Sequence, residues 1–261
     1  MVAEPNRESP KGKTVSLFVT CIVDMMYPQT GMSVVTILER LGVKVIFPMA
    51  QTCCGQPAFN GGNRREAARV AKQFLRAFDG AEVIVTPSGS CATMVRHEFP
   101  TLFAGDSFWG PRAERAASIT WEFSEYLVDG LGITDLGGRL DTPRKVGLHD
   151  ACHGLRLLKL GRQARALIGG IENAEVSEVP DCDVCCGFGG LFAVKMPDVS
   201  GSMLQDKVNS ITGSEADVVV TGDASCLTQI NGGLARSESA VRCVHLADLL
   251  AESLEGQEAP K

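Results

Sequence analysis

Two short stretches of this 261-residue chain place a pair of adjacent cysteines directly before a glycine. They are QTCCGQPAFNGG at 51–62, with Cys53 and Cys54, and DVCCGFGG at 183–190, with Cys185 and Cys186. Adjacent thiols can contact different atoms of one large inorganic group. The glycine that follows, Gly55 or Gly187, lets the backbone turn sharply and come close to such a group.

These pairs belong to a duplication that runs through the chain. TVSLFVTC (14–21) corresponds to KVGLHDAC (145–152), and each is a short apolar strand pattern that ends in a cysteine. The other corresponding segments are FPMAQTCCG (47–55) with VPDCDVCCG (179–187), and AEVIVTPSGSC (81–91) with ADVVVTGDASC (216–226). Three matches in the same order make chance an improbable explanation, and a duplicated unit carries its sites twice.

Each copy therefore contains four matched cysteines, which are Cys21, Cys53, Cys54 and Cys91 in the first and Cys152, Cys185, Cys186 and Cys226 in the second. In each set 31 or 32 residues separate the first cysteine from the pair, and 35 or 38 separate the glycine from the last cysteine. An iron–sulfur cluster is usually held by four cysteine thiolates, and each copy has four cysteines that converge from three loops. The pattern therefore predicts one cluster in each copy.

Two other interpretations of the cysteines stay open. Core packing is ordinary for cysteine and suits Cys243, inside the apolar run VRCVHLADLL, but it explains neither the two CCG triplets nor their spacing. Zinc held by four cysteines is common, although the usual C-x2-C pattern is missing from both matched sets. Cys182 forms CDVC with Cys185, and we interpret it as an incidental or accessory thiol because a Gly-rich turn, not a helix, follows it.

The elements around these cysteines follow an alternation of helix and strand patterns. SVVTILERLG (33–42) and NRREAARVAKQFLRAF (63–78) have helical spacing, and PDVSGSMLQDKVNSI (197–211) takes the corresponding place in the second copy. A short apolar run follows each of them, so each copy is predicted to be strand, helix, strand, helix, strand, helix. The alternation predicts an α/β fold of two pseudo-symmetric repeats, with mostly parallel sheets flanked by helices. The expected divisions are a first repeat at 14–130, a linker at 131–144, a second repeat at 145–251, and flexible tails at 1–13 and 252–261.

In such sheets the carboxyl ends of the strands meet at one edge, so we expect both cysteine sets to lie there. Other motifs carry less information. His149 and His153 in HDACHG stand four apart around Cys152, but at the end of a strand this spacing favours surface or cluster-shielding histidines. GFGG at 187–190 lacks the residues of a phosphate-binding loop, so the sequence does not support nucleotide binding.

Composition narrows the setting further. The chain is 44% apolar and 21% charged with a net charge of -6, which is typical of a globular protein and gives no basic surface for nucleic acid. No segment has the length of a transmembrane span or the character of a signal peptide. We therefore expect a cytoplasmic protein, where ten cysteines indicate metal ligands or redox groups and not a disulfide framework.

The cysteine pattern resembles the CCG cysteine-rich domains of heterodisulfide reductase, of glycolate oxidase iron–sulfur subunits and of anaerobic glycerol-3-phosphate dehydrogenase. Longer stretches are similar to the lactate utilization protein A family over residues 14 to 250. These stretches are SLFVTCIVDMMYP, TCCGQPAFNGG, PSGSCATMVRHEFP, HDACHGLR, CCGFGGLFAVKMP and GDASCLTQINGG.

This resemblance implies an iron–sulfur electron-transfer subunit that acts with two other subunits in oxidising L-lactate to pyruvate, with a [4Fe–4S] cluster in each repeat. It implies an oxidoreductase complex in which this chain does not itself bind lactate, either in the cytoplasm or held by its partners at the inner face of the membrane. The alternatives are a thiol–disulfide redox subunit of the heterodisulfide reductase type and a structural zinc protein.

The chain departs from the reductase pattern at one position in each copy. That pattern ends in C-x2-C, whereas here Ser88 precedes Cys91 and Asp223 precedes Cys226. Each copy therefore has four matched thiols and not five, which argues against a five-thiolate cluster and against disulfide chemistry. Ser88 and Asp223 are expected near the clusters, as nearby donors or occasional ligands.

Overall fold

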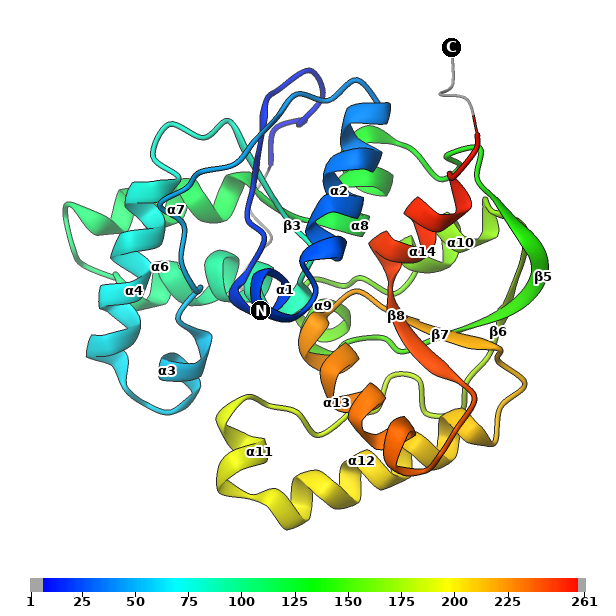
Figure 1. Cartoon of the computed structure of the whole chain (residues 1–261). Helices are drawn as coiled ribbons and strands as arrows, with labels where there is room; N and C mark the ends of the chain where they lie inside the picture. Colours follow the sequence, from blue (N-terminus) through cyan, green and yellow to red (C-terminus); the bar gives the residue numbers. More distant parts are fainter. Residues whose placement is uncertain (1–6, 258–261) are drawn as a thin grey trace.

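Two four-stranded parallel sheets, one from each copy of the duplication, form the framework of the molecule (Figure 1). The computed structural model describes residues 7–257. The strand order is β2-β1-β3-β4 in the first sheet and β6-β5-β7-β8 in the second, and neighbouring strands are parallel in both. Counted from the first strand of each copy, both sheets have the order 2-1-3-4, so the duplication of the sequence is also a duplication of the topology. The predicted α/β fold is confirmed.

The first copy contains these strands and helices, of which η1 and η2 are π-helical: β1 (Val15–Leu17), α1 (Cys21–Met26), α2 (Pro28–Arg40), β2 (Val45–Ile46), α3 (Gln56–Asn60), α4 (Arg64–Ala77), β3 (Val83–Thr86), α5 (Gly89–Thr93), η1 (Met94–Glu98), α6 (Phe99–Leu102), α7 (Trp109–Ile119), β4 (Thr120–Glu122), α8 (Phe123–Glu125) and η2 (Tyr126–Leu131). The second copy contains these: β5 (Arg139–Leu148), α9 (Cys152–Leu157), α10 (Gln163–Gly169), β6 (Glu172–Ser177), α11 (Leu191–Lys195), α12 (Pro197–Thr212), β7 (Val218–Thr221), α13 (Ala224–Arg236), β8 (Arg242–His245) and α14 (Leu246–Ser253).

The central strands β3 and β7 have the sequence pattern that is typical of parallel sheets covered on both faces. Their sequences, VIVT and VVVT, are buried at every position. A strand buried on both faces has a continuous apolar run instead of an alternating one. The sequence predicted three strands in each copy, and the structure adds the short edge strands β4 and β8.

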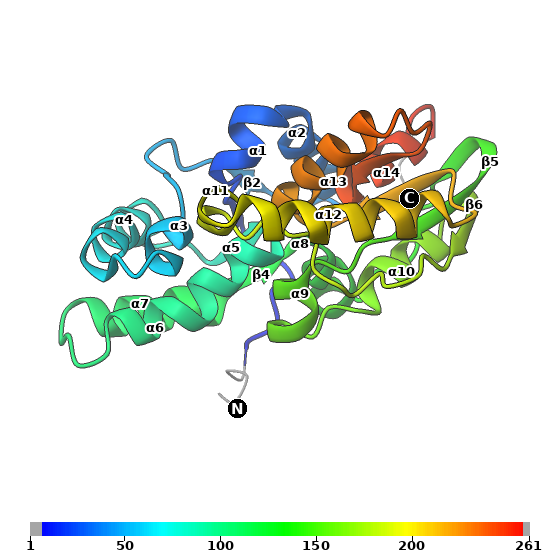
Figure 2. The same ribbon diagram turned by 90° about the horizontal axis from the view of Figure 1, so that it is seen from below.

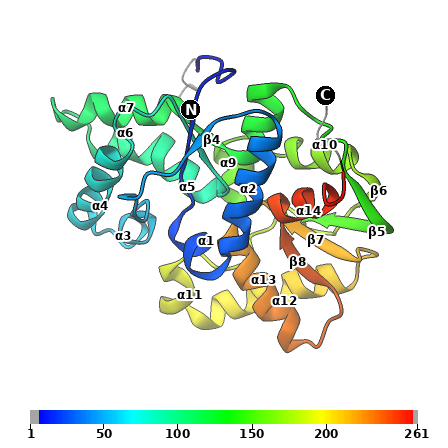
Figure 3. The ribbon, with the colours of Figure 1, turned by 45° about the horizontal axis from the view of Figure 1, so that its top comes forward.

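The two copies are joined by one hydrophobic core that takes residues from both sheets. Helix α2 of the first copy packs against α14 of the second, and α10 of the second packs against α8 and η2 of the first (Figures 1 and 3). At the first contact the carboxylate of Asp248 accepts hydrogen bonds from the hydroxyls of Thr30 at 2.7 Å and Ser33 at 2.9 Å. Seen from below, α4, α6 and α7 lie at one end of the molecule and β5, β6 and α10 at the other (Figure 2).

The expected domain divisions stay a prediction. Within the expected linker 131–144, the chain is in β5 from Arg139 onward. Residues 1–6 and 258–261 of the expected tails lie outside the described residues, whereas the side chain of Arg7 is 10% exposed and pairs with Glu125. In the part of the chain that the structure describes, no helix has the length and apolar character needed to cross a membrane.

Candidate metal centre

The matched cysteines of both copies lie just beyond the carboxyl ends of the sheet strands, as the alternation of elements predicted. Cys21 and Cys152 are the first residues of α1 and α9, which follow β1 and β5. Cys91 and Cys226 lie in α5 and α13, which follow β3 and β7. The adjacent pairs lie in the loops before α3 and α11.

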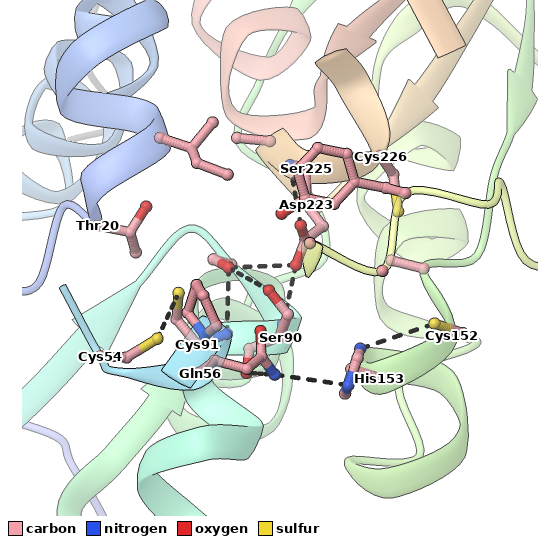
Figure 4. A pocket seen from close by; sticks show the side chains of 18 of the residues that line it. Thr20, Cys54, Gln56, Ser90, Cys91, Cys152, His153, Asp223, Ser225 and Cys226 are labelled. Atoms are coloured by element: carbon pink, nitrogen blue, oxygen red, sulfur yellow. Dashed lines mark hydrogen bonds between the residues drawn. The ribbon is translucent and has the colours of Figure 1, made fainter. Parts of the chain in front are cut away.

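One cavity of about 820 Å³, mouth included, is lined by all eight of these cysteines. In Figure 4 the labelled thiols of the first copy, Cys54 and Cys91, lie on one side, those of the second, Cys152 and Cys226, lie on the other, and Asp223 lies between them. In each copy the second thiol of the pair and the last cysteine are buried, whereas the other two are half-buried. The duplication has therefore produced two equivalent quartets that face each other, not two remote sites.

Within the first quartet the thiols form two close pairs. The Sγ atoms of Cys21 and Cys53 are 3.6 Å apart, and those of Cys54 and Cys91 are 3.4 Å apart. Gly55 has a φ of 84°, a left-handed conformation that favours glycine, and its backbone N–H donates to the Sγ of Cys53 at 3.4 Å. The glycine of the CCG triplet thus turns its own amide toward the first sulfur of the pair.

The second quartet repeats this arrangement at its glycine. Gly187 has a φ of 85°, and its N–H donates to the Sγ of Cys185 at 3.4 Å. Hydrogen bonds from Cys152 and Cys186 lower the pKa of the Cys185 thiol to about 2. In the first copy, hydrogen bonds from Cys21 and Cys54 lower the pKa of the Cys53 thiol to about 3. Each quartet therefore stabilises a thiolate at the first cysteine of its CCG triplet, and a thiolate is the form that binds metals.

The spread of the sulfur atoms bears on what the quartets can hold. Four sulfurs around one zinc ion at about 2.3 Å would all lie about 3.8 Å from one another. Among residues 7–257, His149, Cys186 and Cys226 bring three potential ligand atoms within 4.8 Å of one another. The four sulfur atoms of neither quartet come this close together. Linked pairs of thiols along a cavity wall suit a larger inorganic group, so the donors present fit metal or iron–sulfur binding.

Ser88 and Asp223 lie between the quartets and contact each other. The Ser88 hydroxyl donates to the Asp223 carboxylate at 3.1 Å, and the N–H of Ser90 donates to the same oxygen at 2.8 Å. The other oxygen of Asp223 accepts from the N–H of Ser225 at 3.0 Å. Both side chains cap helices, α5 and α13, and join the two copies, while their expected role near a cluster stays a prediction.

Other residues differ in their relation to the cavity. His153 lines it, with its Nδ1 3.7 Å from the Sγ of Cys152. Cys182 does not line it, and its Sγ lies 3.7 Å from both Asp150 and Arg165. The sequence did not single out Gln56, which lines the cavity and donates from its Nε2 to the carbonyl of Ser90 at 3.1 Å. Its place directly after the first CCG triplet was the available signal.

Comparison with known proteins gives the family. The model of the CCG cysteine-rich domain matches residues 15–96 and 146–231. Lactate utilization protein A of Macrococcus caseolyticus is 46% identical over 241 residues, which cover 92% of this chain and 97% of that protein. Lactate utilization protein A 2 of Bacillus cereus is 42% identical over 240 residues, which cover 92% and 98%.

A solved structure supports the fold alone. A hypothetical protein from Helicobacter pylori has a TM-score of 0.57 and 10% sequence identity, and the match covers 94% of this chain and 50% of that one. The two family-model matches coincide with the two halves that carry the quartets, and the identity to the curated relatives extends over nearly the whole chain. The chain therefore belongs to the lactate utilization protein A family and carries two CCG cysteine-rich domains.

Proposed function

We propose that this chain is the iron–sulfur electron-transfer subunit of a multi-subunit system that oxidises L-lactate to pyruvate. The relatives named for lactate utilization support the substrate. The observation that carries the redox role is the pair of four-thiol sites that face one cavity. Oxidation of lactate to pyruvate releases two electrons and two protons, and an iron–sulfur cluster in each quartet would supply one-electron redox chemistry.

The residues of the chain have definite tasks in this proposal. The eight matched cysteines bind the clusters. The amides of Gly55 and Gly187 donate hydrogen bonds to the first sulfur of each pair. Hydrogen bonds to ligand sulfur and the exclusion of water set the redox potential of such a site. Lactate itself binds to a partner subunit, and the proposed location is the cytoplasm, alone or held at the membrane by partners.

The first experiment is the analysis of iron and acid-labile sulfide in protein purified without oxygen. Cys53→Ala should remove the metal of the first quartet and Cys186→Ala that of the second, so each variant keeps about half of the wild-type iron. Cys243→Ala is the matched control, because this thiol is buried in β8 and does not line the cavity. Full iron content in both quartet variants would refute the ligand assignment.

The partner part of the proposal has its own test. The full chain, produced with the products of its neighbouring genes, should purify as a complex that reduces a one-electron dye with lactate. The Cys186→Ala variant should assemble in the same complex yet fail to pass electrons to the dye. Dye reduction that does not depend on this chain would contradict its role as electron carrier.

Two alternatives are separated by the same preparations. A structural zinc protein would contain zinc, be colourless and contain no sulfide. A disulfide-reducing subunit is favoured by one observation, the open cavity that the thiols of both quartets line. Disulfide reduction consumes two electrons and two protons, so reduction of a small disulfide by the chain and an added one-electron reductant, without lactate partners, would favour this alternative.

A further inference from the structure

His149 is a buried side chain whose polar atoms have no protein partner in the described structure. The residue is 3% exposed, and neither its Nδ1 nor its Nε2 forms a hydrogen bond within residues 7–257. Buried polar atoms are nearly always satisfied, so each exception calls for a missing water, ion or ligand. The imidazole therefore marks a place where a further group binds.

The thiols around the ring indicate what that group is. A ring nitrogen of His149 and the Sγ atoms of Cys186 and Cys226 all lie within 4.8 Å of one another. These are the two buried thiols of the second quartet. Imidazole nitrogen and cysteine sulfur together are a common donor set for transition metals.

The backbone holds this ring in place. The N–H of His149 donates to the carbonyl of Val220 at 2.8 Å, which continues the pairing of β5 with β7. The first copy has the same bond at the matching position, from the N–H of Phe18 to the carbonyl of Val85 at 2.9 Å. The backbone hydrogen bond is therefore the same in both copies, while the side chain differs, with histidine in the second copy and phenylalanine in the first.

Phe18 provides no ligand atom for the first quartet. Its fully buried ring packs edge-on against Phe74 and Phe78, with centroids 4.9 and 5.7 Å away. A phenyl ring has no donor atom, so at this matching position the second copy has a nitrogen beside its thiols and the first copy has none. The two sites differ in chemistry although their cysteines match.

We propose that His149 is a nitrogen ligand of the metal centre held by Cys152, Cys185, Cys186 and Cys226, so that the two halves hold chemically different centres. The inference rests on metal binding by the quartets, as in the proposed function, but not on lactate, partners or the type of cluster. A histidine ligand raises the potential of iron–sulfur centres that contain one. The midpoint potentials of the two sites therefore differ, and the difference shrinks in His149→Phe, the variant that copies the first half.

The first experiment uses the full chain labelled with [15N]histidine and carrying Cys53→Ala, so that the second site alone gives the signal. The protein is purified without oxygen, reduced, and measured by pulsed electron paramagnetic resonance. The expected result is the coupling of a directly bound nitrogen, present also in His153→Gln and lost in His149→Phe and His149→Gln. His153 is the matched control because its ring also lies beside a cysteine of this quartet.

The second experiment separates a failure of this inference from a failure of the proposed function. Metal-free Cys53→Ala protein is titrated with Co2+, whose absorption bands distinguish sulfur donors alone from a donor set that also contains nitrogen. His149→Phe should weaken Co2+ binding by at least about tenfold and change the bands. If the protein contains neither iron nor sulfide, the iron–sulfur function fails while the cobalt spectra still decide the role of His149.

Two results would overturn the inference. One is the absence of a directly bound nitrogen in both the iron and the cobalt forms, and the other is its persistence in His149→Phe. Either would mean that the ring is satisfied by water, for which the cavity of about 40 Å³ that His149 lines with Glu122 and Asp150 has room.

Discussion

Glu122 gives the most quantitative prediction, because its carboxyl group is buried at the junction of β4 and α8. The residue is 2% exposed, and burial raises the pKa of its carboxyl from 4.5 to about 7, against the hydrogen bonds that it accepts from Ser124 and Glu125. In the unfolded chain the group ionises near 4.5, so between pH 5 and pH 8 the folded state binds more protons at this site. The stability that this site contributes is complete below about pH 4.5 and is lost as the pH rises through about 7.

The magnitude follows from the two pKa values. Each pH unit between them is equivalent to about 1.4 kcal/mol, so ionising buried Glu122 lowers the free energy of unfolding by about 3 kcal/mol at pH 8. Glu122→Gln keeps an oxygen that can accept the same hydrogen bonds and cannot ionise. The free energy of unfolding of the variant, relative to wild type, should therefore rise by about 2 to 3 kcal/mol between pH 5 and pH 8, because part of the effect is already present at pH 5.

Urea denaturation of both proteins at pH 5, 6, 7 and 8 measures this difference. The other titratable groups near the site, His149 and Asp150 in the same cavity and Glu125 in the same helix cap, are present in both proteins and cancel. Glu82→Gln is the matched control, because this exposed carboxylate accepts from the N–H of Thr14, which lowers its pKa and places its effect below pH 5. Parallel curves for Glu122→Gln and wild type would refute the raised pKa.

Three further predictions concern the turns, the buried ion pairs and the unmatched thiol. Gly55→Ala should lower the free energy of unfolding by about 1 to 2 kcal/mol, because alanine is strained in the left-handed conformation of this residue. Gly187→Ala should lower it more, since its new Cβ would also lie 2.7 Å from a carbonyl oxygen of α12. Arg96→Met should lower the free energy of unfolding by about 1 to 3 kcal/mol in urea denaturation, because it removes one of the two arginine partners of buried Glu125, a donor at 3.0 Å, and leaves Arg7. Cys182→Ala should retain the full metal content, since this thiol does not line the cavity.

Each of these has a clear contrary result. Equal losses of stability at the two glycines would mean that the close approach to α12 has no energetic effect. A loss below about 1 kcal/mol for Arg96→Met would mean that the pair behaves like an exposed one. Loss of half the metal in the Cys182→Ala variant would place that thiol among the ligands of the second quartet.

The sequence predicted the sheets and the placement of the cysteines because both depend on local pattern. VIVT and VVVT are continuous apolar runs, and each is followed at a short distance by a matched cysteine. The edge strands β4 and β8 were missed because TWE and RCVH are short and mix apolar with polar residues. Their pairing depends on the neighbouring strands, which a local pattern does not contain.

Two features of the site required the tertiary structure. The sequence predicted each quartet at the carboxyl edge of its sheet but not how the two copies pack, and this packing, which includes α2 against α14, brings their cysteines to one cavity. The sequence also favoured a surface or cluster-shielding role for His149. It is buried where β5 pairs with β7, beside Cys186 in the loop before α11 and Cys226 in α13, and both thiols are more than thirty residues away in the sequence.

The difference between the two copies has a consequence for electron transfer. In the proposed electron-transfer role, the potentials of the two centres set how an electron is shared between them, and two quartets with the same cysteines and the same amide donors favour similar potentials. The side chains at matching positions differ: Phe18 corresponds to His149, and Ser88 corresponds to Asp223. The duplicated backbone therefore supplies two sites that can hold metal, and the unmatched side chains beside them are a source of a difference in potential.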